Sequence, residues 1–313
     1  MDLNNRVTTN GLKAWILASR PKTLTGAVSP VLVGAALVPW PFSIQLFALC
    51  LLFAVVMQID ANFVNDYYDY RKGADREDRL GPERACAQGW VTPWAMLIAI
   101  ALTTLLACVV GLLILVNAGH PELLIVGGLC VAGCFLYTTH LSYMGWGDIM
   151  VIIFFGIVPV GFTYYVLTDG QWTLPVTLAG LGMGVATDTL LIINNYRDID
   201  ADRISGKRTL AVRFGRDATL KAYVMCGIVA SILANAAMLV TAWELIDAEV
   251  SNYAAWDGLA TLLPLIYTFI HTRVCLKMVH LTGSELNSVL GLTAASIFLY
   301  GVLLTIGMAI ILN

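Results

Sequence analysis

Long apolar runs separated by short polar segments dominate the chain. A transmembrane helix needs roughly 20 mostly apolar residues, and about nine such runs follow one another here. We therefore predict an all-α polytopic membrane protein with about nine transmembrane helices in one bundle. The predicted spans cover about 23–40, 43–66, 92–117, 121–140, 148–168, 173–196, 218–242, 256–274 and 288–312.

The composition supports a membrane protein. Hydrophobic residues make up 58% of the 313 residues and charged residues only 12%, whereas soluble domains carry about 25% charged residues. Three prolines, Pro30, Pro159 and Pro264, fall inside predicted spans, where a kink is tolerated if neighbouring groups satisfy the freed carbonyls. The seven cysteines include no CxxC pair, so we interpret them as packing residues rather than disulfides or metal ligands.

Basic residues mark one side of the membrane. All 18 Lys and Arg lie in the N-terminal segment, or in or beside the loops after the second, sixth and eighth spans. The loops after the first, third, fifth and seventh spans contain no basic residue, and acidic residues such as Glu122, Asp169 and Glu244 lie in or beside several of them. Because Lys and Arg accumulate on the cytoplasmic side, this pattern predicts the orientation of a multi-pass membrane protein. Its N-terminus and the loops 70–90 and 197–217 then lie in the cytoplasm.

Two Asn/Asp-rich motifs end predicted spans on this cytoplasmic side. They read NFVNDYYDY at 62–70 and NNYRDIDAD at 194–202. Each helical residue turns by about 100°, which places three polar residues of each motif on one face and turns Asp200 away. The predicted faces consist of Asn62, Asp66 and Asp69 in the first motif, and Asn194, Asp198 and Asp202 in the second.

The chemistry of these faces indicates a cation site. Neighbouring carboxylates repel one another, and partial burial adds to the cost. Asp and Asn oxygens suit Mg²⁺ or Ca²⁺, and Mg²⁺ commonly binds through carboxylates together with substrate phosphates. A basic loop follows each motif and offers partners for phosphate. Its residues are Arg71, Lys72, Arg76, Arg79 and Arg84 in the first loop, and Arg203, Lys207 and Arg208 in the second.

The repeated motif and loop predict two related halves within a single domain, 1–313. The halves cover about 20–140 and 148–274, and a final helix covers about 288–312. Paired polar half-sites also occur in ion-coupled transporters, but those sites are expected near the bilayer midplane. Here the acidic residues cluster at the cytoplasmic helix ends. Within the spans, Asp60 and Asp188 should face the bundle interior.

At these motifs the chain resembles the UbiA superfamily of intramembrane aromatic prenyltransferases. The phrases GPERACAQG and NNYRDIDADRISGKRTLAVRFG resemble the branch that uses 1,4-dihydroxy-2-naphthoate in menaquinone synthesis. The sequence departs from the family between the fourth and fifth spans, where it has Gly145, Gly147 and Asp148 without the usual proline. The matching stretches are residues 20–34, 61–75, 81–89 and 194–215.

The resemblance implies a reaction and roles for residues. It implies Mg²⁺-dependent transfer of a polyprenyl group from polyprenyl diphosphate to 1,4-dihydroxy-2-naphthoate, with loss of carbon dioxide and without a redox cofactor. The alternative acceptors are 4-hydroxybenzoate and homogentisate. The expected environment is the lipid bilayer of a bacterial inner membrane, and neither nucleic acid nor an obligatory protein partner is implied.

The implied site residues fall into three groups. The six residues of the two polar faces would hold the metal, and four of them, Asp66, Asp69, Asp198 and Asp202, are the catalytic candidates. Lys72, Arg84, Lys207 and Arg208 would bind the diphosphate. The candidates for the acceptor or cation pocket are Tyr67, Tyr137, His140, Trp146 and Tyr196, together with Phe63, Phe154 and Phe155.

Overall fold

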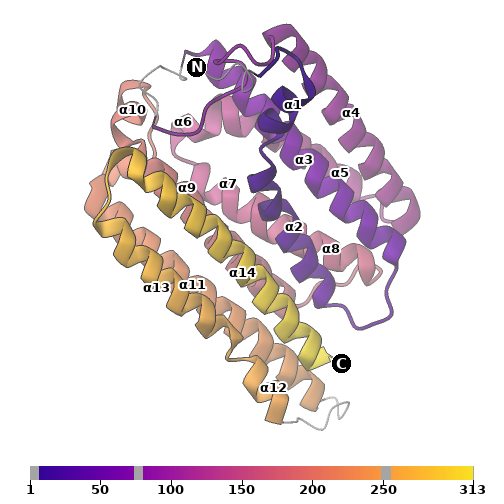
Figure 1. Ribbon diagram of the computed structural model, residues 1–313. Coiled ribbons are helices and arrows are strands. Elements are labelled where there is room, and N and C mark those ends of the chain that lie inside the picture. The colour runs from indigo at the N-terminus through magenta and orange to yellow at the C-terminus, as the bar shows by residue number, and fades with distance from the viewer. Residues whose placement is uncertain (1–6, 74–79, 248–254, 313) are drawn as a thin grey trace.

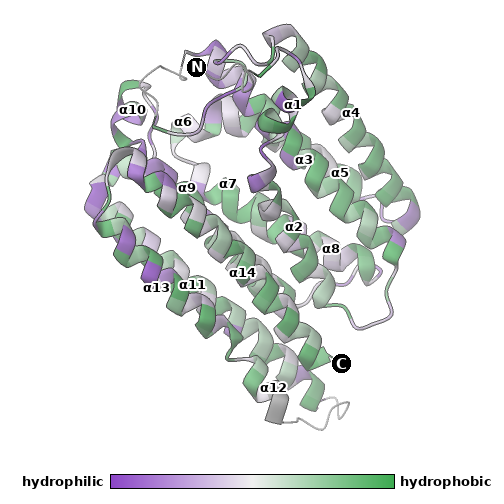
Figure 2. Cartoon of the chain, viewed as in Figure 1, coloured by the Kyte–Doolittle hydropathy of each residue, from purple (hydrophilic) through white to green (hydrophobic). Residues whose placement is uncertain are grey.

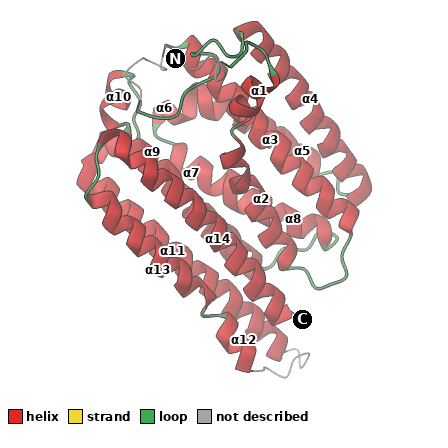
Figure 3. Cartoon of the chain, in the orientation of Figure 1, coloured by secondary structure: helices red, strands yellow, loops and turns green. Residues whose placement is uncertain are grey.

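The computed structural model describes residues 7–73, 80–247 and 255–312, and all regular structure within these ranges is helical (Figure 3). The short helices α1, α6 and α10 lie at one end of the bundle, and α12 and the C-terminus lie toward the other (Figure 1). The α-helices are α1 (Leu12–Ser19), α2 (Pro21–Ala36), α3 (Ile44–Arg71), α4 (Pro93–Ala118), α5 (Leu123–Leu136), α6 (Ser142–Met144), α7 (Gly147–Ile152), α8 (Val158–Leu167), α9 (Leu174–Arg197), α10 (Ile199–Ile204), α11 (Leu210–Asp247), α12 (Ala255–Ala260), α13 (Leu263–Val279) and α14 (Leu286–Leu312).

Within the described ranges, 8 helical stretches are long and apolar enough to cross a membrane. They confirm the predicted class of helical membrane bundle. The predicted span at 23–40 corresponds to α2, which has 16 residues and is shorter than these stretches. The eight stretches are Ile44–Arg71, Pro93–Ala118, Leu123–Met144, Gly147–Leu167, Leu174–Arg197, Leu210–Asp247, Gly258–Val279 and Gly283–Leu312.

The outer surface of the bundle is apolar. On α4, Leu102 and Leu105 are each 61% exposed and Val116 is 73% exposed. A helix facing water would present polar side chains at such positions, whereas lipid accepts leucine and valine. Figure 2 shows hydrophobic residues along the lengths of the helices, with hydrophilic residues more frequent at the end that carries α1 and α10.

The spans are segmented where proline and π-helical turns occur. Pro264 stands in the first turn of α13, where a missing N–H breaks no helical hydrogen bond, whereas Pro159 directly follows the π-helical segment at Ile153–Ile157 within the continuous stretch Gly147–Leu167. Pro30 lies inside α2. The π-helical segments η2 (Tyr137–Leu141) and η3 (Ile153–Ile157) precede α6 and α8. A short 3₁₀ helix, η4 (Gly283–Glu285), precedes α14.

Glycines bring α9 close to the span formed by α7, η3 and α8. A side chain on Gly184 of α9 would meet the carbonyl oxygen of Ile152 at 2.5 Å, and one on Gly147 would meet the Leu191 side chain at 3.2 Å. Small residues permit such approaches between membrane helices. The contact fixes the wall of the cavity described below. The division of the chain into two related halves remains a prediction.

Candidate active site

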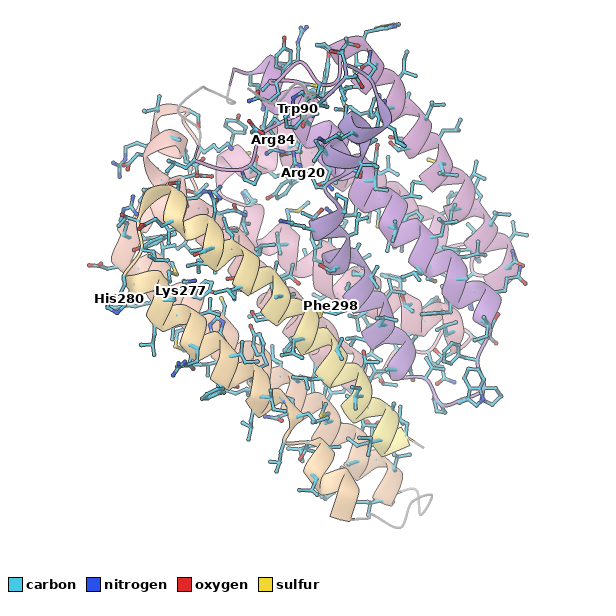
Figure 4. The ribbon with its side chains drawn as sticks, in the orientation of Figure 1. Arg20, Arg84, Trp90, Lys277, His280 and Phe298 are labelled. Carbon is cyan, nitrogen blue, oxygen red and sulfur yellow. The ribbon has the colours of Figure 1, made fainter. Side chains whose placement is uncertain are left out.

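One large cavity connects the polar end of the bundle with its apolar interior. Its volume is about 1760 Å³, and α2, α3, α5, α8, α9 and α14 contribute to its wall. Phe154, Phe155 and Phe162 line the apolar part. Arg20, Arg84 and Trp90 lie together at the polar end (Figure 4). The charged residues among its lining residues are Arg20, Lys22, Lys72, Arg84, Arg197, Lys207 and Arg216, and Asp69, Glu83, Asp148, Asp198, Asp200 and Asp202.

The polar residues of the first motif have different surroundings: some line the cavity, and some form hydrogen bonds with other segments of the protein. Asp69 lines the cavity and accepts a hydrogen bond of 3.4 Å from Nη2 of Arg84. Asn62 also lines the cavity, but its Nδ2 donates to the Ser19 carbonyl at 2.9 Å and to Oγ1 of Thr23 at 3.0 Å. Asn62 therefore ties α3 to the junction of α1 and α2.

Asp66 does not reach the cavity wall. It is 1% exposed, and its two carboxylate oxygens accept hydrogen bonds of 2.9 Å from the backbone N–H groups of Ala85 and Cys86. Arg20 lies 3.9 Å away. In the structure Asp66 therefore contacts the loop before α4, although helix phase placed it on one face with Asp69.

The second motif is broken at Asp198. Helix α9 ends at Arg197, and α10 begins at Ile199. The Arg197 side chain donates to both carboxylate oxygens of Asp198, at 2.7 and 2.6 Å, and to Oδ1 of Asn194 at 3.1 Å. The same guanidinium donates to Asn287 at 2.7 Å. This buried arginine joins the motif to α14 while Asn194 and Asp198 still line the cavity.

Asp202 interacts electrostatically with carboxylates of both motifs. It is 7% exposed and forms an ion pair of 3.7 Å with Nζ of Lys207. Burial raises the pKa of Asp202 to about 6; Lys207 opposes the shift, and the Asp198 and Asp69 carboxylates add to it. Because Asp69 comes from α3 and Asp202 from α10, the two motifs converge on one region of the cavity.

Two lysines from different loops share an aromatic neighbour. Nζ of Lys72 lies 4.0 Å from the centre of the Tyr143 ring, and Nζ of Lys207 lies 5.5 Å from it. Lys72 also donates to the Thr139 carbonyl at 2.8 Å. Loss of water contact lowers the pKa of Lys72, Asp69 opposes this, and Lys207 adds to it. The two ammonium groups thus face the same part of the cavity.

Several predicted residues lie away from this cavity. Arg208 is exposed, and its backbone N–H donates to the Tyr143 carbonyl at 3.0 Å. Among the aromatic candidates, Tyr137, Phe154 and Phe155 line the cavity, while Phe63 is buried in a separate cluster. Arg76 and Arg79 lie outside the described residues. The pocket candidates that the structure does not bring to the wall are Tyr67, His140, Trp146 and Tyr196.

The structure adds site residues that the helix phase did not select. Asn65 lines the cavity beside Asp69, and the Asn-Asp pair at 65–66 was the signal for it. Arg20 has φ of 50°, a left-handed conformation that is uncommon for arginine, and it lines the same polar end. Arg197 lies within the second motif and Tyr143 lies outside both motifs, and helix phase selected neither.

The donor set at the polar end fits a hard divalent cation. Asp69, Asp198 and Asp202 supply carboxylates, and Asn65 and Asn194 supply amide oxygens. Within the described ranges, no three His, Cys, Asp or Glu residues are arranged to hold a metal ion. Each carboxylate instead has a basic partner, Arg84, Arg197 or Lys207. Metal binding would therefore require these side chains to exchange partners.

Comparison with known proteins defines the family. The profile of the UbiA prenyltransferase family matches residues 27–248. The chain belongs to this family. A "1,4-dihydroxy-2-naphthoate octaprenyltransferase" of Mycobacterium tuberculosis is 37% identical over 238 residues, which cover 73% of this chain and 79% of that protein. The Escherichia coli protein of the same name is 36% identical over 232 residues, or 71% of this chain and 74% of that protein.

Solved structures of UbiA homologues share the fold. The apo structure from Aeropyrum pernix gives a TM-score of 0.68 at 17% identity and covers 92% of this chain and 99% of that one. A homologue from Archaeoglobus fulgidus, bound to GPP and Mg²⁺, gives 0.65 at 16% identity and covers 93% of this chain and 99% of that one. This UbiA-family chain is thus an integral membrane prenyltransferase with the family's helical fold.

Proposed function

We propose that this UbiA-family enzyme transfers a polyprenyl group from polyprenyl diphosphate to 1,4-dihydroxy-2-naphthoate. The ring loses its carboxylate as carbon dioxide, and the product is demethylmenaquinone. The observation that carries the proposal is the convergence of both motifs and both lysine-bearing loops on one end of an apolar cavity. Relatives at 36–37% identity bear the name of this activity.

The polar end is suited to a diphosphate. Lys72 and Lys207 point at one region from two loops, and Arg84 lies beside Asp69. Arg and Lys form strong charge-assisted hydrogen bonds to phosphate oxygens. These side chains would bind the diphosphate and stabilise the negative charge that grows on it as the allylic C–O bond breaks. We assign no part in this binding to Arg208, because its side chain is exposed.

Asp69, Asp198, Asp202, Asn65 and Asn194 would hold Mg²⁺. When bound, the ion would neutralise diphosphate charge and so make the leaving group better. The basic partners of the three carboxylates would then be released to phosphate oxygens. Asn62 keeps α2 and α3 in place, and Asp66 keeps the loop at 85–86 in place, so we assign both to positioning.

The apolar part of the cavity suits the prenyl group and its allylic cation. Phe154 and Phe155 line it, and Tyr137 lies on the wall toward the polar end. Aromatic faces stabilise a cation, and an apolar wall keeps water from capturing it. The long tail would extend along this wall toward the bilayer, which accounts for the use of a membrane fold.

Orientation follows from the charge pattern. We place the N-terminus, the polar end of the cavity and both basic loops on the cytoplasmic side of a bacterial inner membrane. A water-soluble aromatic acid and diphosphate would then enter and leave from the cytoplasm, while the prenyl tail stays in the lipid.

The test is a product assay with purified full-length protein. Polyprenyl diphosphate, Mg²⁺ and a panel of aromatic acids are supplied, and products are identified by mass. We expect a prenylated naphthoquinol that has lost the mass of carbon dioxide. A product from 4-hydroxybenzoate or homogentisate instead would change the acceptor. Absence of any prenylated product and of diphosphate release would contradict enzymatic transfer and favour the transporter alternative.

A further inference from the structure

Two carboxyl groups outside both motifs lie near each other where α7 packs against α9. Asp148 is in the first turn of α7 and lines the cavity. Asp188 lies within α9 and is 4% exposed. The two groups are within electrostatic range of one another.

Helix geometry explains this proximity. Gly184 of α9 approaches Ile152 of α7, and Leu191 approaches Gly147, so the two helices run past each other in opposite directions. Residues four apart lie on one face of a helix. Asp188, four residues after Gly184, therefore falls opposite Asp148, four residues before Ile152.

Each of these groups has an oxygen without a partner. In the described part of the chain, Oδ1 of Asp148 and Oδ1 of Asp188 are buried and receive no hydrogen bond. Asp60, another buried acid in the membrane, differs because Thr103 and Thr104 donate to its two oxygens at 2.5 and 2.9 Å. Burying an unpartnered polar atom is costly, and two adjacent buried negative charges are costlier still. A shared proton, or a hydroxyl group of a ligand, would satisfy both oxygens.

The pair borders the part of the cavity where donor and acceptor would meet. The Tyr137 ring lies 3.9 Å from the position that a side chain on Gly147 would take. Tyr137 is within electrostatic range of Asp148 and Asp188, and also of Asp69 and Asp202. The pair is therefore one aromatic ring away from the polar end, and Phe154 and Phe155 continue the wall beyond it.

We propose that Asp148, backed by Asp188, binds a phenolic hydroxyl of the aromatic acceptor and shuttles its proton during transfer. The proposal rests on the proposed function, because it needs a hydroxylated aromatic acid as acceptor. Asp148 touches the acceptor and is the catalytic residue, whereas Asp188 acts through Asp148 and is a positioning residue.

The proposed proton transfers to and from Asp148 cancel over the whole reaction. The ring carbon that carries the carboxylate forms a C–C bond to the allylic carbon as diphosphate leaves. The neighbouring O–H becomes a carbonyl, and its proton passes to Asp148. The bond to the carboxylate then breaks, carbon dioxide leaves, and the electron pair returns through the ring to the oxygen. That oxygen takes the proton back from Asp148, so no net acid or base is consumed. Two carboxyl groups sharing one proton are able to accept and donate in turn.

The experiment uses full-length protein in detergent with prenyl diphosphate, Mg²⁺ and 1,4-dihydroxy-2-naphthoate. We expect Asp148→Asn to lower kcat about 100-fold, which is within the usual contribution of a positioned base. Its affinity for prenyl diphosphate should stay within about twofold, because both binding loops remain. Asp188→Asn should lower kcat about tenfold by the same reasoning, since it leaves Asp148 in place.

Chemical rescue separates proton transfer from structural support. Asp148→Ala leaves space on the cavity wall, and added formate should restore part of its activity because formate supplies the missing carboxylate. Asp60→Asn is the matched control: it alters a buried membrane acid that does not line the cavity. We expect it to retain transfer within about threefold, provided that its hydrogen bonds to threonines persist.

The outcomes are distinguishable. If the wild type prenylates the naphthoate and Asp148→Asn does so at the wild-type kcat, the shuttle is wrong and the proposed function stands. A folded Asp148→Ala protein that formate does not rescue would also overturn the shuttle. If the wild type prenylates no aromatic acid, the proposed function fails, and the shuttle fails with it. Should Asp148→Asn not fold, the formate experiment on Asp148→Ala decides.

Discussion

The two Asn/Asp motifs have similar spacing but different backbones. Helix α3 continues without interruption through the first motif and ends at Arg71. Helix α9 ends within the second motif, and Asp198 stands between α9 and α10. The first motif therefore lies on one continuous helix, whereas in the second motif Asn194, Asp198 and Asp202 line the same cavity across a break between two helices.

The motifs also differ in what their central carboxylates contact. Asp66 in the first binds two N–H groups of a loop, whereas Asp198 in the second binds the guanidinium of Arg197 and lines the cavity. Backbone N–H groups cannot leave a carboxylate without unfolding the loop, but a side chain can rotate away. The comparison indicates that Asp66 of the first motif has a structural contact with the backbone. Asp198 of the second motif contacts a side chain that can move away, which leaves its carboxylate available to a ligand.

The largest effect is expected at Asp198. Asp198→Asn removes a charge at the polar end of the cavity but preserves much of the shape and one acceptor for Arg197. We expect transfer to fall by about 1000-fold, as when a main electrostatic stabiliser of a leaving group is lost. The measurement is diphosphate release and prenylated product from folded protein.

Asp200→Ala is the matched control for this change. Asp200 borders the cavity, but its side chain is 78% exposed and pairs with Arg203 and Arg216 at 3.8 and 3.4 Å. Exposed ion pairs contribute little, so transfer should stay within about threefold. Equal losses for Asp198→Asn and Asp200→Ala, at equal protein levels, would contradict the assignment of the acidic ligands.

Asp66→Ala should lose activity for a different reason. Two charge-assisted hydrogen bonds to buried N–H groups disappear, which costs on the order of 3 kcal/mol of local stability. We expect transfer to fall by about 100-fold, together with faster amide hydrogen exchange at Ala85 and Cys86. Asp198→Asn should leave the exchange at these two amides unchanged. If Asp66→Ala is inactive with normal exchange there, Asp66 acts at the metal and its positioning role is wrong.

The sequence predicted the fold because lipid imposes simple rules. Apolar runs of sufficient length must form helices, and the predicted spans agree with the described helices within several residues at most ends. It predicted the two motif regions because acidic residues in membrane helices are energetically costly, so their presence indicates a functional site. It did not predict the π-helical turn at Tyr137–Leu141, which depends on packing rather than on local preference.

Individual site residues were harder to predict than the site. Helix phase selects a face, but it does not say what covers that face. Asp66 shares a face with Asp69, yet a loop 19 residues further along the chain covers it. Arg208 adjoins Lys207 in sequence, but the chain turns there and leaves its side chain exposed. Asn65 was passed over because it lies off the chosen stripe, although it lines the cavity.

The neighbouring cations of the second loop offer a sharper test. Lys207 lines the cavity and pairs with Asp202, whereas Arg208 is exposed. Lys207→Ala should weaken prenyl diphosphate binding by about 30-fold, because a half-buried charge-assisted contact to phosphate is lost. Arg208→Ala should change it by less than about twofold. Calorimetry with an unreactive analogue measures both. Similar losses in the two variants would mean that the loop rearranges to bring Arg208 into the site.

The smallest effect concerns the coupling between metal and diphosphate. In the structure, Asp69, Asp198 and Asp202 each have a basic partner, so Mg²⁺ alone must displace side chains to bind. A diphosphate supplies oxygens to the metal and also accepts the displaced Arg84, Arg197 and Lys207. The two ligands should therefore bind with positive coupling, which linkage makes reciprocal.

We expect the affinity for Mg²⁺ to tighten about tenfold, or about 1.4 kcal/mol, in the presence of an unreactive prenyl diphosphate analogue. Calorimetry on the wild type and on Lys207→Ala measures this, and the variant should show weaker coupling because one displaced partner is missing. Equal Mg²⁺ affinity with and without the analogue would mean that the acids form a self-sufficient metal site. The contrast between a carboxylate held by backbone and carboxylates held by exchangeable side chains would then lose its functional meaning.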